Sequence, residues 1–434
     1  MKICSNKDIK IMAAVMASSI LLGGCTATSK PAATQALKND PEIKADINFN
    51  EVKNAGYDKE IMDEQYRRYC FDLLSQTVKD YGGEGNVMIS PASIMLALDM
   101  VAAGAKDESL RQLTDLFAVG EGPLNQQAYA ASIMDKINGA QKVDFSCANA
   151  VWSNRKLLGD AVNLEYIDYI KETFDAEYRI RDFDSKTPDE INSWVYEHTD
   201  HMIEKVISSL DPMTVMVLVN AISFDGKWEE PYEDNQVHEA EFTKWDGTTQ
   251  KGDFLYGAET AYFESEKATG FMKAYEGGQY SFLAILPSDE SVSANEFAKN
   301  FTSADYEKFI GSLTYEYDVY TGMPVFKSDF DITLNDTLKN LGAKNAFDPE
   351  TADLSGIAGK PGDLYIAKVI HKTHIEVDAN GTKAAAVTVV RVDGAGAIAN
   401  PKEYRTVMCD RPFVYAIIDN ETMAPIFIGT VNEI

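Results

Sequence analysis

The 434-residue sequence contains few cysteines and few histidines, five of each. No two cysteines have the C-x-x-C spacing of zinc and redox motifs, and the three that follow the N-terminal region (Cys70, Cys147 and Cys409) are an odd number. Cys70 and Cys147 lie among apolar residues, which is typical of core thiols. His198, His201, His238 and His374 do not form a recognisable ligand set either. The sequence therefore indicates no disulfide framework, no metal site and no other cofactor.

Positive charge is also scarce. Lys and Arg number 40 against 68 Asp and Glu, so the formal net charge is −28. Such an acidic chain repels nucleic acid, heparin-like polyanions and anionic lipid headgroups, so no nucleic-acid partner is expected. Hydrophobic residues make up 45% of the chain and charged residues 25%, as in ordinary soluble proteins. The length allows two average domains or one large mixed domain.

The N-terminus contains a short apolar run. Lys2, Lys7 and Lys10 precede the run over residues 11–22, which is too short to span a bilayer and ends in Leu22-Gly23-Gly24-Cys25. Small residues directly before a cysteine resemble the bacterial lipoprotein signal, in which the cysteine is lipidated. Residues 1–24 are therefore predicted to be a signal peptide, and Cys25 a lipid anchor to the bacterial cell membrane or surface. An ordinary secretory signal with a chance cysteine is the alternative.

A flexible tether is predicted between Cys25 and the folded body. Residues 25–57 are rich in Ala, Thr, Lys and Asp, contain Pro31 and Pro41, and show little apolar periodicity. The protein is accordingly expected to lie outside the cytoplasm, with a globular body held away from the membrane.

Helical patterns dominate the first part of the body. Apolar residues recur at helical spacing over residues 61–79. Ser90 and Pro91 form a favoured cap and first turn for a helix over residues 92–103, which Gly104 ends. This helix is apolar nearly all round, so it is expected to be buried. Further helices are predicted over residues 164–172, 188–198 and 332–341.

Strand patterns dominate the rest. Residues 214–224 are apolar on both faces, as expected for a central strand that is covered on both sides. Residues 280–286 and 364–378 are two further strands, and residues 413–419 and 425–431 are predicted to form a C-terminal hairpin. Helices followed by strands mixed with short helices predict one α+β domain over residues 58–434.

The most informative segment covers residues 376–393. After the Asn380-Gly381 turn it reads as a strand with two different faces. Small or apolar residues form one face (Thr382, Ala384, Ala386, Thr388, Val390, Val392), and every charge lies on the other (Lys383, Ala385, Val387, Val389, Arg391, Asp393). Residues 394–401 then have the composition of a loop. The segment thus has the pattern of a buried strand but continues as an exposed loop.

Several motifs resemble those of the serpin family, in the order that serpins have them. They are residues 86–94 with Gly104-Ala105-Lys106, residues 218–228 (LVNAISFDGKW), Leu341-Gly342 with Ala346-Phe347, His371-Lys372 with Glu376-Val377, Gly381 to Ala386, and Arg411-Pro412-Phe413. The resemblance covers essentially the whole body. It implies an α+β serpin fold with three β-sheets, about eight or nine helices and an exposed reactive-centre loop at about residues 379–401.

The resemblance also implies a function. A serpin is expected to be a suicide inhibitor rather than an enzyme, and to act as a monomer. A target serine protease cleaves the loop and forms a covalent acyl complex with it, and the cleaved loop then inserts into the main sheet. A non-inhibitory serpin that acts as a binding module is the alternative.

The resemblance makes residues 381–386 the hinge of the inserting loop (Gly381, Thr382, Lys383, Ala384, Ala385, Ala386). Thr382 is the first side chain that must enter the sheet, so its small size favours inhibition, and Gly381 is expected to supply turn freedom. An ordinary alanine-rich loop would not explain why charges occur only on the outward face. Two residues depart from the family pattern: Ala379 and Lys383 stand where glutamate is usual or common.

Counting from the hinge places the reactive bond at Ala395-Gly396. Counting back from Pro412-Phe413 places it nearer Pro401, which leaves a window of alternatives (Asp393, Gly394, Ala397, Ile398, Ala399, Asn400). These residues are mostly small and apolar, which favours elastase-like or subtilisin-like targets. Arg391 is a second possible cleavage point, although its loop would be too short for complete insertion.

Ser90, Ser93, Asn220 and His371 match the serpin shutter, a buried hydrogen-bond cluster under the main sheet. A Ser–His hydrolase is the rival interpretation, but Ser90 is explained as a helix cap and lacks a G-x-S-x-G context. Trp228 matches the breach, where the loop first enters the sheet. A plain core tryptophan is the alternative there.

Overall fold

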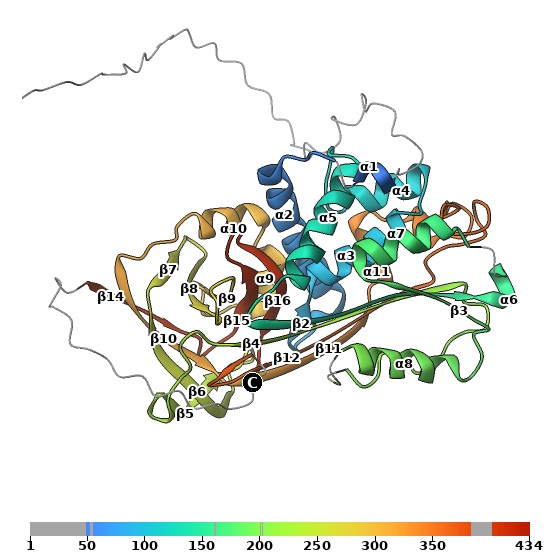
Figure 1. Ribbon diagram of the computed structural model, residues 1–434. Coiled ribbons are helices and arrows are strands. Elements are labelled where there is room, and N and C mark those ends of the chain that lie inside the picture. Colours follow the sequence, from blue (N-terminus) through green and yellow to red (C-terminus); the bar gives the residue numbers. More distant parts are fainter. Residues whose placement is uncertain (1–48, 53–54, 160–161, 200, 202, 383–401) are drawn as a thin grey trace, which may run out of the picture. The chain divides into compact units, whose positions relative to one another are not determined.

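The computed structural model describes residues 49–52, 55–159, 162–199, 201, 203–382 and 402–434 (Figure 1). Its main sheet has six strands in the order β11-β12-β13-β4-β2-β3. Their bounds are β11 Phe326–Thr333, β12 Lys368–Val377, β13 Gly381–Thr382, β4 Met216–Lys227, β2 Val143–Asn154 and β3 Glu177–Arg181. The predicted central strand is confirmed, because β4 is buried from Met216 to Phe224 and lies inside the sheet.

Helices cover both faces of this sheet, which explains why β4 is apolar on both. On one face lies α3 (Pro91–Ala102), in which every residue is buried. On the other lies α8 (Thr187–His198), whose Ile191, Trp194 and Val195 pack against apolar residues of β2, β4 and β12. Figure 1 shows α8 on the side of the sheet opposite to α3.

The second sheet has the order β1-β16-β15-β9-β8-β7. Its strands are β1 Val87–Ile89, β7 Ala261–Glu264, β8 Ala268–Ala274, β9 Tyr280–Pro287, β15 Phe413–Asp419 and β16 Ala424–Val431. The predicted C-terminal hairpin is confirmed, since β15 and β16 pair antiparallel. The helix α2 (Lys59–Thr77) packs on β16, where the Tyr66 hydroxyl donates to the Pro425 carbonyl at 3.0 Å.

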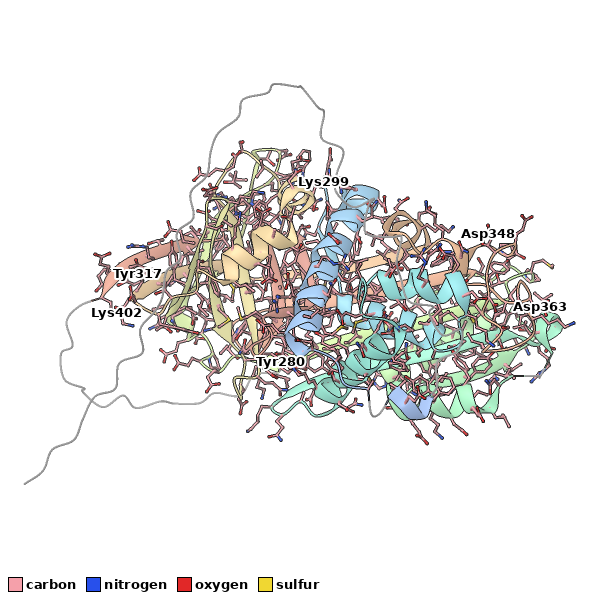
Figure 2. The ribbon with its side chains drawn as sticks, turned by 90° about the horizontal axis from the view of Figure 1, so that it is seen from above. Tyr280, Lys299, Tyr317, Asp348, Asp363 and Lys402 are labelled. Atoms are coloured by element: carbon pink, nitrogen blue, oxygen red, sulfur yellow. The ribbon has the colours of Figure 1, made fainter. Side chains whose placement is uncertain are left out.

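The third sheet has the order β14-β10-β6-β5, with β14 at one edge. Its strands are β5 Val237–Thr243, β6 Thr249–Glu259, β10 Tyr317–Pro324 and β14 Glu403–Met408. β14 pairs parallel with β10 and begins directly after Lys402. Figure 2 shows Lys402 close to Tyr317, whereas Asp348 and Asp363 lie at the other end of the view.

Local sequence signals set the ends of several helices. The Ser90 Oγ accepts a hydrogen bond from the Ser93 backbone N–H, and Pro91 occupies the first turn of α3, as predicted. The remaining helices are α1 Phe49–Val52, α4 Asp107–Asp115, α5 Pro123–Asn138, α6 Arg155–Leu158, α7 Leu164–Phe174, α9 Ala294–Asn300, α10 Ser303–Ile310 and α11 Asn335–Leu341. Without the single-turn α1 and α6, the described residues contain nine α-helices, as the serpin pattern implied.

One predicted boundary is wrong. The helix expected over residues 332–341 begins only at Asn335, because Ile332 and Thr333 belong to β11 and pair with β12. Both residues are β-branched and fit a pleated ladder better than a helix. None of the described helices is both long and apolar enough to cross a membrane.

Candidate functional site

At one end of the main sheet, the short strand β13 lies between β12 and β4. The two strands pair directly and in parallel only from Lys368–Lys372 to Val217–Ala221. Farther along, β13 lies between them: Thr382 pairs with Val377 of β12 and with Gly226 of β4. We call the region between residues 373–377 of β12 and residues 222–227 of β4 the sheet opening. The start of the predicted hinge therefore already occupies the end of the sheet opening.

Thr382 is enclosed by the sheet. Its exposed fraction is 1%, and its Oγ1 lies 2.6 Å from the Tyr275 hydroxyl. Burial raises the pKa of Tyr275 far above its usual value, so the phenol stays neutral and can share its proton in this hydrogen bond. Tyr275 was not found by sequence reasoning, because a single tyrosine at the end of a strand carries no local signal of this role.

Gly381 is required for close approach rather than for turn freedom. Its φ is not in the left-handed region, so the predicted reason for this glycine is wrong. A Cβ at this position would lie 2.1 Å from the Gly226 carbonyl oxygen and 2.8 Å from the Lys227 Cα. Both are backbone atoms of β4, which cannot move aside as a flexible side chain can. Only glycine lets the chain pass this point between the strands.

Trp228 binds the chain that leads into the hinge. Its side chain is 1% exposed, and its indole Nε1 donates to the Asp378 carbonyl at 2.9 Å. Its backbone N–H donates to the Asn380 carbonyl at 2.9 Å, and the Tyr232 backbone N–H donates to the Ala379 carbonyl at 2.8 Å. The ring also stacks on Tyr275, with centroids 4.6 Å apart. Trp228 is thus a buried residue with specific contacts to the segment directly before the hinge, which a plain core tryptophan would not need.

Ala379 contacts Tyr232 through its backbone carbonyl. The buried ion pair near this segment is formed by residues of β8 and β6. Lys273 lies 2.9 Å from Glu259, and the two side chains are only 7% and 17% exposed. The Lys273 ammonium also lies over the Tyr232 ring, 4.4 Å from its centroid. Burial raises the pKa of Glu259 despite the attraction of Lys273. The Lys273–Glu259 ion pair therefore forms without a charged side chain at residue 379.

The four residues predicted to form the shutter meet under the direct β12–β4 ladder. His371 and Asn220 are paired across that ladder. The Ser90 backbone N–H donates to His371 Nε2 at 3.1 Å, and the Ser93 hydroxyl donates to Asn220 Oδ1. Three elements far apart in the sequence (the start of α3, β4 and β12) are therefore connected at one point.

Asn149 extends this cluster and was missed by the sequence analysis. The Asn220 Nδ2 donates to Asn149 Oδ1 at 2.6 Å, and the Asn149 Nδ2 donates to the Phe174 carbonyl at 3.1 Å. Asn149 lies opposite Asn220 in the β2–β4 ladder. The only signal that could have found it is a polar residue inside a buried strand, and that signal does not identify its partner.

The geometry does not support a Ser–His hydrolase. His371 Nε2 faces the backbone N–H of Ser90, whereas the Ser90 hydroxyl donates to the Ile426 carbonyl at 2.8 Å. Burial lowers the pKa of His371 to about 3, so the ring is neutral and poorly able to take a proton. Its Nδ1 has no hydrogen-bond partner within the described part of the chain. A nucleophile–base pair is therefore not formed.

The remaining predicted positions lie outside the described residues. They are Lys383, Ala384, Ala385 and Ala386 of the hinge, Arg391, the reactive-bond window over residues 393–400, and the lipidation site Cys25. No group of three or more metal-ligating side chains occurs among the residues that the structure describes.

A family model described as serpin (serine protease inhibitor) matches residues 64–434. This chain belongs to the serpin family. An uncharacterized serpin-like protein of Methanosarcina mazei is 29% identical over 433 residues, which cover 98% of this chain and 97% of that protein. Leukocyte elastase inhibitor A of Mus musculus is 33% identical over 390 residues, covering 82% of this chain and 96% of the inhibitor.

Solved serpin structures share the fold. The crystal structure of the thermophilic serpin tengpin in the native state has a TM-score of 0.78 and 37% identity, covering 88% of this chain and 96% of tengpin. Tengpin in the latent state has a TM-score of 0.73 and 34% identity, covering 87% and 98%. The three sheets and the mixed α/β architecture of this serpin are those of its family.

Proposed function

We propose that this serpin is a suicide inhibitor of serine proteases with a preference for small apolar residues, either elastase-like or subtilisin-like. The observation that carries the proposal is Thr382, a small side chain buried at the end of the sheet opening while β12 and β4 still pair directly beyond it. Gly381 and Thr382 already lie between the two strands, and the strands still pair directly from Lys368–Lys372 to Val217–Ala221.

Cleavage in the window over residues 393–400 would release the loop at one end. Residues from 383 onward would then continue β13 between β12 and β4, with the small side chains of the Thr382 register turned inward. This requires the direct ladder at Lys368–Lys372 to part. His371 and Asn220 are paired in that ladder, so their contacts with Ser90 and Ser93 are the ones that must rearrange.

The energetics favour such a step. About a dozen inserted residues would each contribute roughly 0.5–1.5 kcal/mol through new ladder hydrogen bonds. This sum is comparable with the whole stability of a domain, about 5–15 kcal/mol. A displacement of catalytic groups by only ~1 Å costs on the order of a hundredfold in rate, so a distorted acyl-enzyme would stall before hydrolysis. The intact serpin would then be a kinetic trap.

The test is to incubate the purified protein with elastase and with subtilisin, and to analyse the products on a denaturing gel. An SDS-stable complex together with a released C-terminal fragment is expected. Mass spectrometry of that fragment identifies the reactive bond, which is expected within residues 393–400. Cleavage without a complex would refute the inhibitory mechanism and favour a non-inhibitory serpin that acts as a binding module.

We also propose that the body is anchored to a bacterial membrane through a lipid on Cys25, with the signal peptide over residues 1–24 removed. The proposal rests on the Leu22-Gly23-Gly24-Cys25 motif behind the apolar run. In a bacterial host, Cys25→Ser should move the protein from the membrane fraction to the soluble extracytoplasmic fraction. Cys4→Ser is the matched control and should leave it in the membrane fraction. Equal fractionation of the two variants would refute the anchor.

A further inference from the structure

Two exposed tyrosines stack on each other at the end of the third sheet that adjoins Lys402, and a third precedes β10 in the chain. Tyr315, Tyr320 and Tyr404 have exposed fractions of 55%, 49% and 56%. Among the large hydrophobic side chains that are exposed in the described part of the chain, they are the three most exposed aromatic ones. We call them the tyrosine patch. Figure 1 shows β10 and β14, the strands of Tyr320 and Tyr404, side by side, and Figure 2 labels the neighbouring Tyr317 and Lys402.

The strand register holds two of the rings in a fixed arrangement. β10 and β14 pair in parallel, with Asp318 opposite Tyr404 and Tyr320 opposite Thr406. Because side chains alternate along a strand, Tyr320 and Tyr404 share one face of the sheet. Their rings stack with centroids 5.3 Å apart and an interplanar angle of 25°. The pair is therefore ordered before any partner arrives.

The Tyr315 backbone, and Arg405 after Tyr404 in β14, also have defined neighbours. The Tyr315 carbonyl accepts a hydrogen bond from Lys402 Nζ at 3.0 Å. The Arg405 guanidinium lies over the Tyr317 ring, 3.9 Å from its centroid. Arg405 and Tyr317 alternate with the patch residues along their strands, so they support the edge from the other face.

An exposed, pre-ordered pair of tyrosines with a third nearby in the chain has the chemistry of a protein-binding surface. Tyrosine offers a large apolar ring with a polar tip and few rotatable bonds, so it loses little entropy on binding, and it is enriched where binding energy concentrates. A cross-strand aromatic pair also stabilises a sheet, which is the competing explanation. That explanation accounts for the stacking but gives no reason for the exposure of Tyr315 or for the exposure of about half of each stacked residue.

The position of the patch along the chain identifies its partner. Tyr404 is four positions after Asn400, at the end of the reactive-bond window, and four extended residues span at most about 14 Å. A protease that holds the Asn400 end of this window in its active site must therefore approach the patch. Gly396 of the Ala395-Gly396 bond is eight positions before Tyr404, which is at most about 29 Å of extended chain. We propose that the tyrosine patch is an auxiliary docking surface for the target serine protease, which strengthens the encounter complex before cleavage. This inference rests on the proposed inhibitory function.

The test compares association rates of full-length variants with subtilisin and with elastase. The double substitution Tyr320→Ala with Tyr404→Ala should lower the second-order rate constant of inhibition at least about tenfold, in the range seen for truncated interface tyrosines. The stoichiometry of inhibition should stay unchanged, because the loop and the sheet opening are untouched. Tyr320→Phe with Tyr404→Phe keeps the rings and should retain most of the rate.

Trp245→Ala is the matched control. Trp245 is also an exposed aromatic residue of the third sheet, at 37%, but it lies in the turn between β5 and β6, and β5 is at the edge opposite to β14. Its removal should leave the rate unchanged. Thermal unfolding of each variant separates docking from stability, since a purely structural pair would lower the unfolding temperature without slowing association.

The outcome for the patch is separable from that for the proposed function. If the wild-type protein forms covalent complexes and the double alanine variant forms them equally fast, the patch proposal is wrong and the inhibitory function stands. If the wild type forms no covalent complex, the patch is tested by a binding measurement. The wild type and the double alanine variant are each titrated with a subtilisin whose catalytic serine is replaced by alanine. Loss of that binding in the double variant supports the patch, whereas equal or absent binding overturns it.

Discussion

At the residue scale, Gly381 and Thr382 meet different physical demands although they are neighbours. Gly381 is needed because backbone atoms of β4 fill the space where its side chain would be. Thr382 is accepted because its side chain is small and its hydroxyl has a partner in Tyr275. A residue that fails either demand should keep the chain out of the sheet opening.

Under the proposed mechanism, Thr382→Arg should abolish inhibition and leave the protein a substrate of the protease. A guanidinium at this 1%-exposed position would be buried without a counterion, which costs several kcal/mol. Gel analysis with subtilisin should show cleaved protein and no covalent complex. Thr382→Ser, which keeps a small hydroxyl, is the control and should form the complex normally. An unchanged yield of complex from the arginine variant would rule out insertion.

His371 predicts a loss of stability in acid. Its folded pKa is about 3, below the ordinary value of 6.5, so between these values the unfolded chain binds more protons. Stability should therefore fall as pH decreases from 6.5 towards 3, by up to about 1.4 kcal/mol per pH unit from this group. His371→Gln keeps an acceptor for Ser90 but does not titrate. Its unfolding temperature should fall less than that of wild type between pH 7 and pH 4.5, and parallel curves would contradict the assignment.

At the scale of elements, β12 and β4 of the main sheet pair directly along one stretch and are separated along the next, where β13 lies between them. The β12–β4 ladder lies over the Ser90–His371 and Ser93–Asn220 contacts, and α8 covers the other face of the same strands. The proposed insertion must separate these strands and disturb both layers, which would slow insertion without making it unfavourable. The two-residue β13 marks where separation would begin.

Gly381→Ala should remove β13 from the sheet. The added methyl group would lie 2.1 Å from the Gly226 oxygen, so the hinge must leave its position and the Trp228 indole would lose its bond to Asp378. Hydrogen–deuterium exchange of the peptide over residues 378–382 should become faster. Gly85→Ala is the control, because a Cβ at Gly85 would meet no atom within 4 Å. Equal exchange in both variants would show that β13 does not depend on this close approach.

At the scale of the whole molecule, the serpin is predicted to gain stability when its loop is cut. Insertion would add a strand to the main sheet, with ladder bonds worth about 0.5–1.5 kcal/mol each, so the unfolding temperature should rise on the order of 10 °C. Calorimetry before and after limited subtilisin cleavage measures this change. In Thr382→Arg the same cleavage should give little or no rise. No rise in wild type would favour the non-inhibitory alternative.

Much of the fold was predictable from local patterns. The Ser90-Pro91 start of α3, the doubly apolar β4 and the C-terminal hairpin follow from capping, from side-chain alternation and from turn residues. These signals act over a few residues, so they can be recognised in a single segment. They cannot say which strand lies next to which, and the boundary at Asn335 shows that pairing with another strand can override a helical pattern.

The sequence by itself determined that a face of small residues begins at Thr382, because side-chain alternation is a property of one strand. Only the tertiary structure decided what surrounds Thr382. It placed Tyr275 against Thr382, Asn149 behind Asn220, and two backbone segments so close that residue 381 must be glycine. These contacts join residues far apart in the chain, and strand pairing, which is a long-range interaction, brings them together.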